Sequence, residues 1–292
     1  MKKHSTIIMV LFFFMGLLVL LYPSISEFHN QKVQSKEIAD YEYILEKIEE
    51  KNYDNIFQEA DEYNEKLRNL VDQFIDYRDL ENYNEVLNIN NRGMMGYISI
   101  EKIKVELPIF HGTSEKTLSN AAGHLEGTSF PVGGKGTHSA ISAHRGLASA
   151  TLFTNLDKLE IGDTFTITVL DRLLTYEIDQ ILIVDPKDTS ALEINDNEDY
   201  VTLITCTPYG INSHRLLVRG KRIENIKEKM YITTEAFKIS PFVVTPLVAL
   251  PIILIILIII ILKPIEYNFN KIKQKYVYPN TAKEGIGNVK KS

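Results

Sequence analysis

Two uncharged apolar runs, one near each end of the sequence, constrain the fold more than any other feature. The first extends from Thr6 to Tyr22, and as a helix rising about 1.5 Å per residue it would span about 26 Å, slightly less than a bilayer core of roughly 30 Å. The second extends from Pro241 to Leu262 and would reach about 33 Å. Residues 241–262 are too long and too uniform for a core helix and are predicted to form a transmembrane helix.

The first apolar run has two possible fates. Lys2 and Lys3 supply the positive start that is typical of an export signal, and Ser24-Ile25-Ser26 offers a weak cleavage site. Residues 1–26 are therefore predicted to be either a removed signal peptide or an N-terminal membrane anchor. Both alternatives direct the following region out of the cell.

Charge is distributed unevenly along the chain. The protein carries 32 Lys and Arg against 38 Asp and Glu, a net charge of −6, yet residues 1–26 hold two lysines and no acid, and residues 239–292 hold seven lysines and only two acids. The region between the apolar runs is therefore strongly acidic, which argues against a nucleic acid partner because phosphate binding needs clustered cations. The lysines after Leu262 predict a cytoplasmic tail at residues 263–292 that faces the anionic inner leaflet, with the acidic region outside.

The organisation of the acidic region changes near Asn91. Within residues 27–91, apolar side chains recur every three or four positions and predict a helix packed on a core; they are Tyr53, Ile56, Phe57, Ala60, Tyr63, Leu67, Leu70 and Val71. From Gly96 onward the apolar period becomes two. Strands are predicted at residues 97–100, 139–142, 164–170, 174–184, 200–205 and 215–222. Many short strands with little helix between them favour a closed antiparallel barrel or a sandwich over residues 92–238.

Three predicted strand ends carry residues suited to acyl transfer. The single cysteine, Cys206, ends one strand just before Thr207-Pro208, and Arg215 begins the returning strand. His144 follows another strand and precedes a glycine turn. Together they could supply a thiolate nucleophile, a proton donor and a cation for the oxyanion, on one rim at the barrel mouth.

Each of these residues also has a simpler interpretation. A free cysteine is often a buried packing residue, a lone histidine is usually a surface residue, and Arg215 alone could form a surface ion pair. His214 competes with His144 for the histidine role. Because side chains alternate along a strand, His214 and Arg215 cannot both face the same cleft.

Three longer strings resemble the sortase family, and most closely its class C, pilus-assembling members. They are TLITCTPYGINSHRLLVRG (Thr202 to Gly220), SAHRG (Ser142 to Gly146) and GHLEGTSFPVGG (Gly123 to Gly134). The resemblance implies a mainly β fold: a closed eight-stranded sortase-type barrel with an N-terminal helical segment and flanking transmembrane helices. It also implies a cysteine transpeptidase on the outer face of a Gram-positive membrane.

The same resemblance implies roles for the candidate residues. Cys206 would attack the threonine carbonyl of an LPxTG-type sorting signal, which is cleaved between Thr and Gly. His144 would protonate the leaving amine, and Arg215 would hold the carbonyl or oxyanion. The acyl group would pass to a lysine amine of a pilin subunit, and no cofactor or metal is expected.

A further part of the resemblance concerns a lid over the cleft. Class C enzymes carry an Asp-Pro-aromatic lid there, and the corresponding residues here are Asp72, Gln73 and Phe74. Residues 72–74 keep the acid and the ring but lose the rigid proline, so a more readily opened lid is expected. The alternative is that Asp72 and Phe74 simply continue the acidic helix.

Two other functions remain open from the sequence. A sortase of another class would attach surface proteins to the amine of a cell-wall precursor. A non-catalytic, membrane-anchored barrel could bind surface proteins with Cys206 in a structural role.

Overall fold

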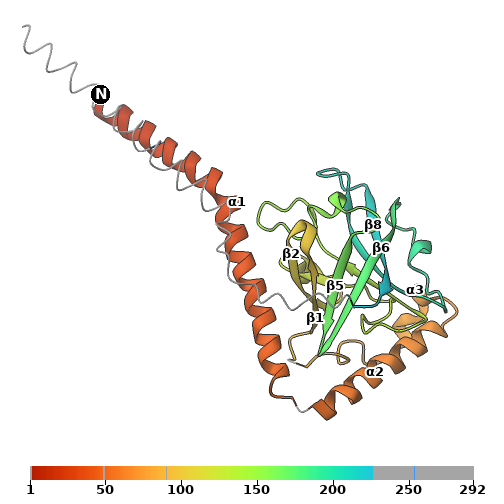
Figure 1. Cartoon of the computed structure of the whole chain (residues 1–292). Coiled ribbons are helices and arrows are strands. Elements are labelled where there is room, and N and C mark those ends of the chain that lie inside the picture. The colour runs from red at the N-terminus through yellow and green to blue at the C-terminus, as the bar shows by residue number, and fades with distance from the viewer. Residues whose placement is uncertain (1, 49, 90, 226–252, 254–292) are drawn as a thin grey trace, which may run out of the picture. The chain divides into compact units, whose positions relative to one another are not determined.

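The computed structural model describes residues 2–48, 50–89, 91–225 and 253. The predicted transmembrane run 241–262, apart from Ile253, and the predicted tail 263–292 lie outside the described residues. Helical elements precede the barrel (Figure 1): α1 (Lys2–Leu45), α2 (Glu50–Arg68), α3 (Gln73–Asp76) and the 3-10 turn η1 (Tyr77–Asp79).

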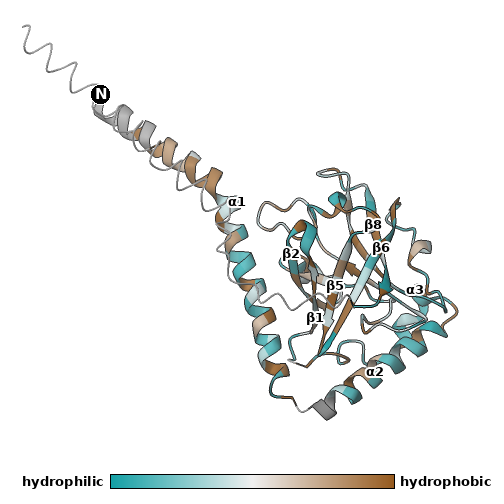
Figure 2. Cartoon of the chain, viewed as in Figure 1, coloured by the Kyte–Doolittle hydropathy of each residue, from teal (hydrophilic) through white to brown (hydrophobic). Residues whose placement is uncertain are grey.

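Helix α1 has an apolar N-terminal part and a long continuation beyond it. Its N-terminal part is apolar (Figure 2), and large side chains such as Leu18, Val19 and Leu20 are mostly exposed. Within the described residues, α1 is the one helix long and apolar enough to cross a membrane, which indicates membrane anchoring. The helix does not end at Ser26 but continues to Leu45, with Pro23 inside it.

Helix α2 confirms the apolar stripe that the sequence predicts. Five residues of that stripe are buried in the main core: Tyr53, Phe57, Ala60, Tyr63 and Leu67. The stripe continues past the end of the helix at Arg68 to Leu70, which packs against the same core, whereas Val71 is fully exposed. The opposite face of α2 is acidic, so the helix covers the barrel with one side and meets solvent with the other.

Eight strands form a closed barrel in the order β1-β2-β3-β4-β7-β8-β6-β5. Their bounds are β1 Met94–Ile100, β2 Val105–His111, β3 Ala122–His124, β4 Thr137–Ser142, β5 Thr164–Val169, β6 Arg172–Val184, β7 Asp199–Thr207 and β8 His214–Ile223. The barrel is mixed rather than antiparallel, because β2 pairs with β3 and β4 pairs with β7 in parallel. The sandwich alternative is wrong. A parallel neighbour needs a long crossover, here the chain from β4 through β5 and β6 to β7, and nothing local in the sequence reveals it.

Strands β2 and β3 are the two that the sequence pattern missed. Pro108 lies in the middle of β2, where it pairs with Tyr97, and a proline within an apolar run argues against a strand. Strand β3 contains only three residues, too few to show a period.

Strands β7 and β8 separate two apolar faces. Val201 and Leu203 of β7 belong to the main core, whereas Ile204 belongs to a second, smaller cluster with Leu217 of β8 and Ala140 of β4. Because side chains alternate along a strand, this second cluster covers the outer face of the barrel wall. Strand β6 contributes to it beyond an irregularity in its pairing with β8 between residues 178 and 180, where the alternation shifts by one position.

Candidate active site

Cys206 and Arg215 lie on β7 and β8, which are adjacent strands of the barrel. Cys206 is a partly exposed free thiol near the end of β7, and it pairs directly with Arg215 at the start of β8. Directly opposed residues in an antiparallel pair project to the same face. The hairpin that the sequence predicts around these two residues is therefore confirmed.

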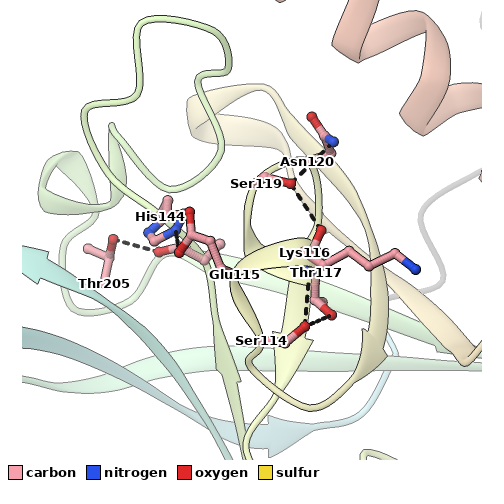
Figure 3. A network of polar contacts seen from close by, with 9 residues as sticks. Ser114, Glu115, Lys116, Thr117, Ser119, Asn120, His144 and Thr205 are labelled. Carbon is pink, nitrogen blue, oxygen red and sulfur yellow. Dashed lines mark hydrogen bonds and ion pairs between the residues drawn. The ribbon is translucent and has the colours of Figure 1, made fainter.

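His144 reaches the same place from β4. This strand runs parallel to β7, with Ser142 paired to Ile204. The pairing continues past the end of the strand, because the Ala143 amide donates to the Ile204 carbonyl (3.1 Å) and the Thr205 hydroxyl donates to the Ala143 carbonyl (2.8 Å). Figure 3 shows Thr205 and His144 on neighbouring segments. The backbone directly before His144 is therefore held by hydrogen bonds to β7, the strand that carries Cys206.

All three candidate residues line one cleft of about 290 Å³. The rest of the lining is largely apolar and includes Leu118, Leu125, Val184, Leu192, Ile204 and Leu217. Most of these side chains belong to the outer-wall cluster or pack against it. The cleft therefore lies on the outside of the barrel wall and not in the barrel mouth. The sequence located the strand ends correctly but could not show which face of β7 the barrel encloses.

At the polar end of the cleft, His144 and Arg215 each form polar contacts with neighbouring residues. His144 Nε2 lies 3.2 Å from Glu115 Oε2 (Figure 3), and the His144 side chain is 25% exposed. Glu115 begins the short helix α4 (Glu115–Leu118), whose N-cap is Ser114. Arg215 Nη1 donates to the carbonyl of His214 (3.1 Å), which holds the guanidinium beside the β7–β8 loop. His214 itself is exposed and bonds to Ser213.

Sequence reasoning missed Glu115 and Arg145 near the site. Arg145 is buried, with its side chain only 8% exposed, and it pairs with Asp157 at 2.5 Å. Its Nη1 also lies 3.4 Å from the hydroxyl of Thr207, the residue after Cys206. Arg145 therefore links the loop that follows His144 to β7, the strand that carries Cys206. Its position directly after His144 is the one sequence signal that could have pointed to it.

The predicted lid residues lie beside the cleft but do not line it. Asp72 caps α3 by accepting from the Phe74 amide (2.9 Å), and no ion pair between Asp72 and Arg215 occurs in the described part of the chain. Phe74 packs against the outer-wall cluster that contains Ile204 and Leu217. The ring therefore supports the apolar part of the cleft.

The Gln73 side chain fastens this segment instead of freeing it. Its amide nitrogen donates to the Gly127 carbonyl (3.1 Å) and, more weakly, to the Leu192 carbonyl (3.4 Å). Its amide oxygen accepts from the Ile194 amide (3.3 Å). Leu192 lines the cleft, so Gln73 holds α3 to the loop that forms one cleft wall.

The described residues contain no group of three or more His, Cys, Asp or Glu side chains that could hold a metal ion. The candidate reactive groups that line the cleft are the thiol of Cys206, the imidazole of His144 and the guanidinium of Arg215.

The comparisons with known proteins agree with this geometry. A family model described as the sortase domain matches residues 98–223. The crystal structure of sortase C1 from Streptococcus agalactiae is 47% identical, covers 65% of this chain and 99% of that chain, and gives a TM-score of 0.60. The chain belongs to the sortase family. Sortases are cysteine transpeptidases, and the cleft with Cys206 lies within the matched domain.

Other relatives place this sortase within the family. Sortase C from Clostridium perfringens is 39% identical, covers 65% of this chain and 99% of that chain, and has a TM-score of 0.56. Among curated relatives, sortase D from Bacillus subtilis is 32% identical over 131 residues, which are 44% of this chain and 63% of that protein. The sortase thus spans less than two thirds of the length of that curated relative. The solved structures from Streptococcus agalactiae and Clostridium perfringens are both class C sortases.

Proposed function

We propose that this sortase cleaves an LPxTG-type sorting signal between Thr and Gly and joins the threonine to a lysine amine of a pilin subunit. The observation that carries the proposal is the convergence of Cys206, His144 and Arg215 on one cleft. These three side chains can supply the nucleophile, the proton donor and the oxyanion donor that acyl transfer uses.

The proposed reaction has two steps: a thioester forms on Cys206, and its acyl group is then transferred to an amine. In the first, the Cys206 thiolate forms a C–S bond to the threonine carbonyl while Arg215 donates hydrogen bonds to the oxyanion. The C–N bond to glycine then breaks, and His144 gives its proton to the departing amine. In the second step, neutral His144 accepts a proton from the incoming amine as that amine attacks the thioester. The C–S bond breaks and the Cys206 thiolate is restored.

The cleft has a polar end and an apolar end, as such a substrate requires. Cys206 and Arg215 form the polar end, where the scissile bond would lie. Leu192, Ile204 and Leu217 form an apolar surface next to it, which fits the leucine and proline side chains that precede the threonine. Burial of such side chains stabilises binding by about 25 cal/mol per Å² of apolar surface.

A lysine amine of a pilin is the acceptor that we favour. The supporting observation is the 39–47% identity to class C sortases, one of which is described as sortase C1 of a pilus island of Streptococcus agalactiae. A cell-wall precursor amine is the second candidate, because curated relatives include sortases A and D. We further propose that the barrel is extracellular and that residues 263–292 are cytoplasmic.

The test uses the full-length protein in detergent micelles with a synthetic sorting-signal peptide. Intact-mass analysis should show a thioester on Cys206 and release of the glycine fragment, and both should be absent in Cys206→Ala. Adding a pilin-derived lysine peptide or a cell-wall precursor in parallel identifies the preferred acceptor. Noncovalent binding without a thioester would favour the non-catalytic barrel instead.

A further inference from the structure

Polar side chains are buried on the part of α1 that follows its apolar run. Glu27 is only 9% exposed and Gln34 only 7% exposed. With the partly buried Asn30 they form one stripe, which Ile38 and Tyr41 continue at spacings of three and four. Polar side chains are rarely buried without a partner, so this stripe marks a specific contact with the barrel.

The first contact of the stripe is with the loop that carries His144. Glu27 Oε2 accepts from the backbone amide of Thr151 at 2.6 Å, and Asn30 Nδ2 donates to the backbone carbonyl of Ser149 at 2.7 Å. These two backbone groups are partnered by α1 side chains. Backbone groups that lose such partners must find water or another partner, which favours a different loop conformation.

The same loop connects these α1 contacts to His144 within a few residues. The Phe153 amide donates to the His144 carbonyl at 3.1 Å, two residues beyond Thr151. Leu152 and Phe153 are buried in the main core. The segment between His144 and Phe153 is therefore a closed loop, fixed by the barrel at its ends and by α1 near its middle.

The second contact reaches His144 from the other side. Gln34 Nε2 donates to the Asn120 carbonyl at 2.8 Å, just after α4. At the beginning of α4, Glu115 Oε2 lies 3.2 Å from His144 Nε2. Figure 3 shows Glu115 and Asn120 at the two ends of this short segment. Helix α1 thus contacts both segments that touch the catalytic histidine.

We propose that Glu27 and Gln34 of α1 are positioning residues that hold His144 in place for catalysis. The same helix that anchors the protein in the membrane then completes the support of the active site. At about 1.5 Å per residue, Glu27 lies about 7.5 Å beyond Tyr22, the end of the apolar run. The histidine loop is therefore held close to the membrane end of the domain, where a membrane-tethered substrate would present its signal. This inference rests on the proposed role of His144.

The experiment compares variants of the full chain in detergent micelles. Glu27→Leu combined with Gln34→Leu should lower kcat for peptide cleavage about 10-fold, with KM within twofold of wild type, because the cleft surface that binds the peptide is untouched. Glu27→Gln should stay within twofold in kcat, since its amide oxygen can still accept from Thr151. Ser35→Leu, on the exposed side of α1, is the matched control and should match wild type.

Hydrogen exchange gives a readout that does not depend on activity. The double variant should exchange faster at residues 145–153 while β7 and β8 keep wild-type protection. If the double variant does not fold, Asn30→Ala should show the same local increase alone. Wild-type exchange rates in that loop, or a double-variant kcat within twofold of wild type, would overturn the inference. Absence of wild-type turnover would instead refute the proposed function, and the exchange data would still report on the contact.

Discussion

Cys206 and Arg215 are direct partners across the β7–β8 pair, one position from the end where the hairpin loop joins the two strands. Side chains opposed in this way have Cβ atoms about 5 Å apart and share a face. Backbone pairing alone therefore places the thiol next to the guanidinium, before either side chain makes any specific contact. His144 joins them because β4 and β7 are also neighbours.

This pairing predicts how the two residues respond to substitution. Cys206→Ala should abolish peptide cleavage and leave the melting temperature within a few degrees, because the thiol is partly exposed and forms no disulfide. Arg215→Lys should lower kcat/KM about 100-fold, since an ammonium cannot reproduce the guanidinium fork. Steady-state kinetics and circular dichroism measure both effects.

His214→Ala is the matched control for these variants. The His214 side chain is exposed and, among the described residues, hydrogen-bonds only to the neighbouring Ser213, so its removal should leave kcat/KM unchanged. Full turnover by Cys206→Ala, or a large loss in His214→Ala, would show that the catalytic residues have been assigned incorrectly.

Gln73 should restrain the cleft wall. Gln73→Ala removes the bonds to Gly127, Leu192 and Ile194, and it should increase the rate of Cys206 alkylation several-fold by loosening that wall. Gln73→Pro removes the same side-chain bonds and should also increase alkylation, although restoring the rigid proline of the class C lid would, from the sequence pattern alone, be expected to decrease it. Asp72→Ala with Phe74→Ala should act in the same direction, because it removes the cap of α3 and its apolar contact.

Ile75→Ala provides the control for this series, because Ile75 is on the same short helix and 64% exposed. It should be alkylated at the wild-type rate. Equal rates in all variants would mean that residues 72–76 do not govern access to the thiol.

Buried neutral histidines should make the fold sensitive to acid. Burial lowers the pKa of His124 to about 3 and that of His138 to about 4, against about 6.5 in the unfolded chain. Below pH 6.5 the unfolded state binds more protons, so the free energy of unfolding falls as pH falls toward these values. The loss is about 1.4 kcal/mol per pH unit for each histidine.

Urea denaturation at several pH values between 7 and 4.5 measures this slope. His138 donates to the Glu193 carbonyl and accepts from the Thr202 hydroxyl, and His138→Asn should give a shallower slope with lower stability at pH 7. A stability that does not change between pH 6.5 and 4.5 would contradict the assignment of neutral histidines.

The proposed topology predicts which parts are open to protease on intact, wall-stripped cells. Residues from roughly 30 to 235 should be digested, whereas an epitope after Lys263 should survive, because the run 241–262 is long enough to cross a bilayer of about 30 Å. Immunoblots with a C-terminal tag test this. Loss of the tag from outside would reverse the orientation.

The sequence by itself determined the local features of this protein. Apolar spacing located α2 and six of the strands, and local composition identified the apolar part of α1. The strings around Cys206, His144 and Arg215 indicated the family and the residues proposed here to be catalytic. These features are encoded in residues that are close together in the chain, where periodicity and motif spacing are visible.

Only the tertiary structure decided the relationships between distant segments. The parallel pairing of β4 with β7, the outer-wall location of the cleft and the contact of Gln73 with Leu192 join residues tens to more than a hundred positions apart. The contact of Glu27 with Thr151 spans the membrane helix and the histidine loop. Such contacts depend on how whole elements pack, and no local pattern in the sequence specifies which distant backbone group a buried polar side chain will meet.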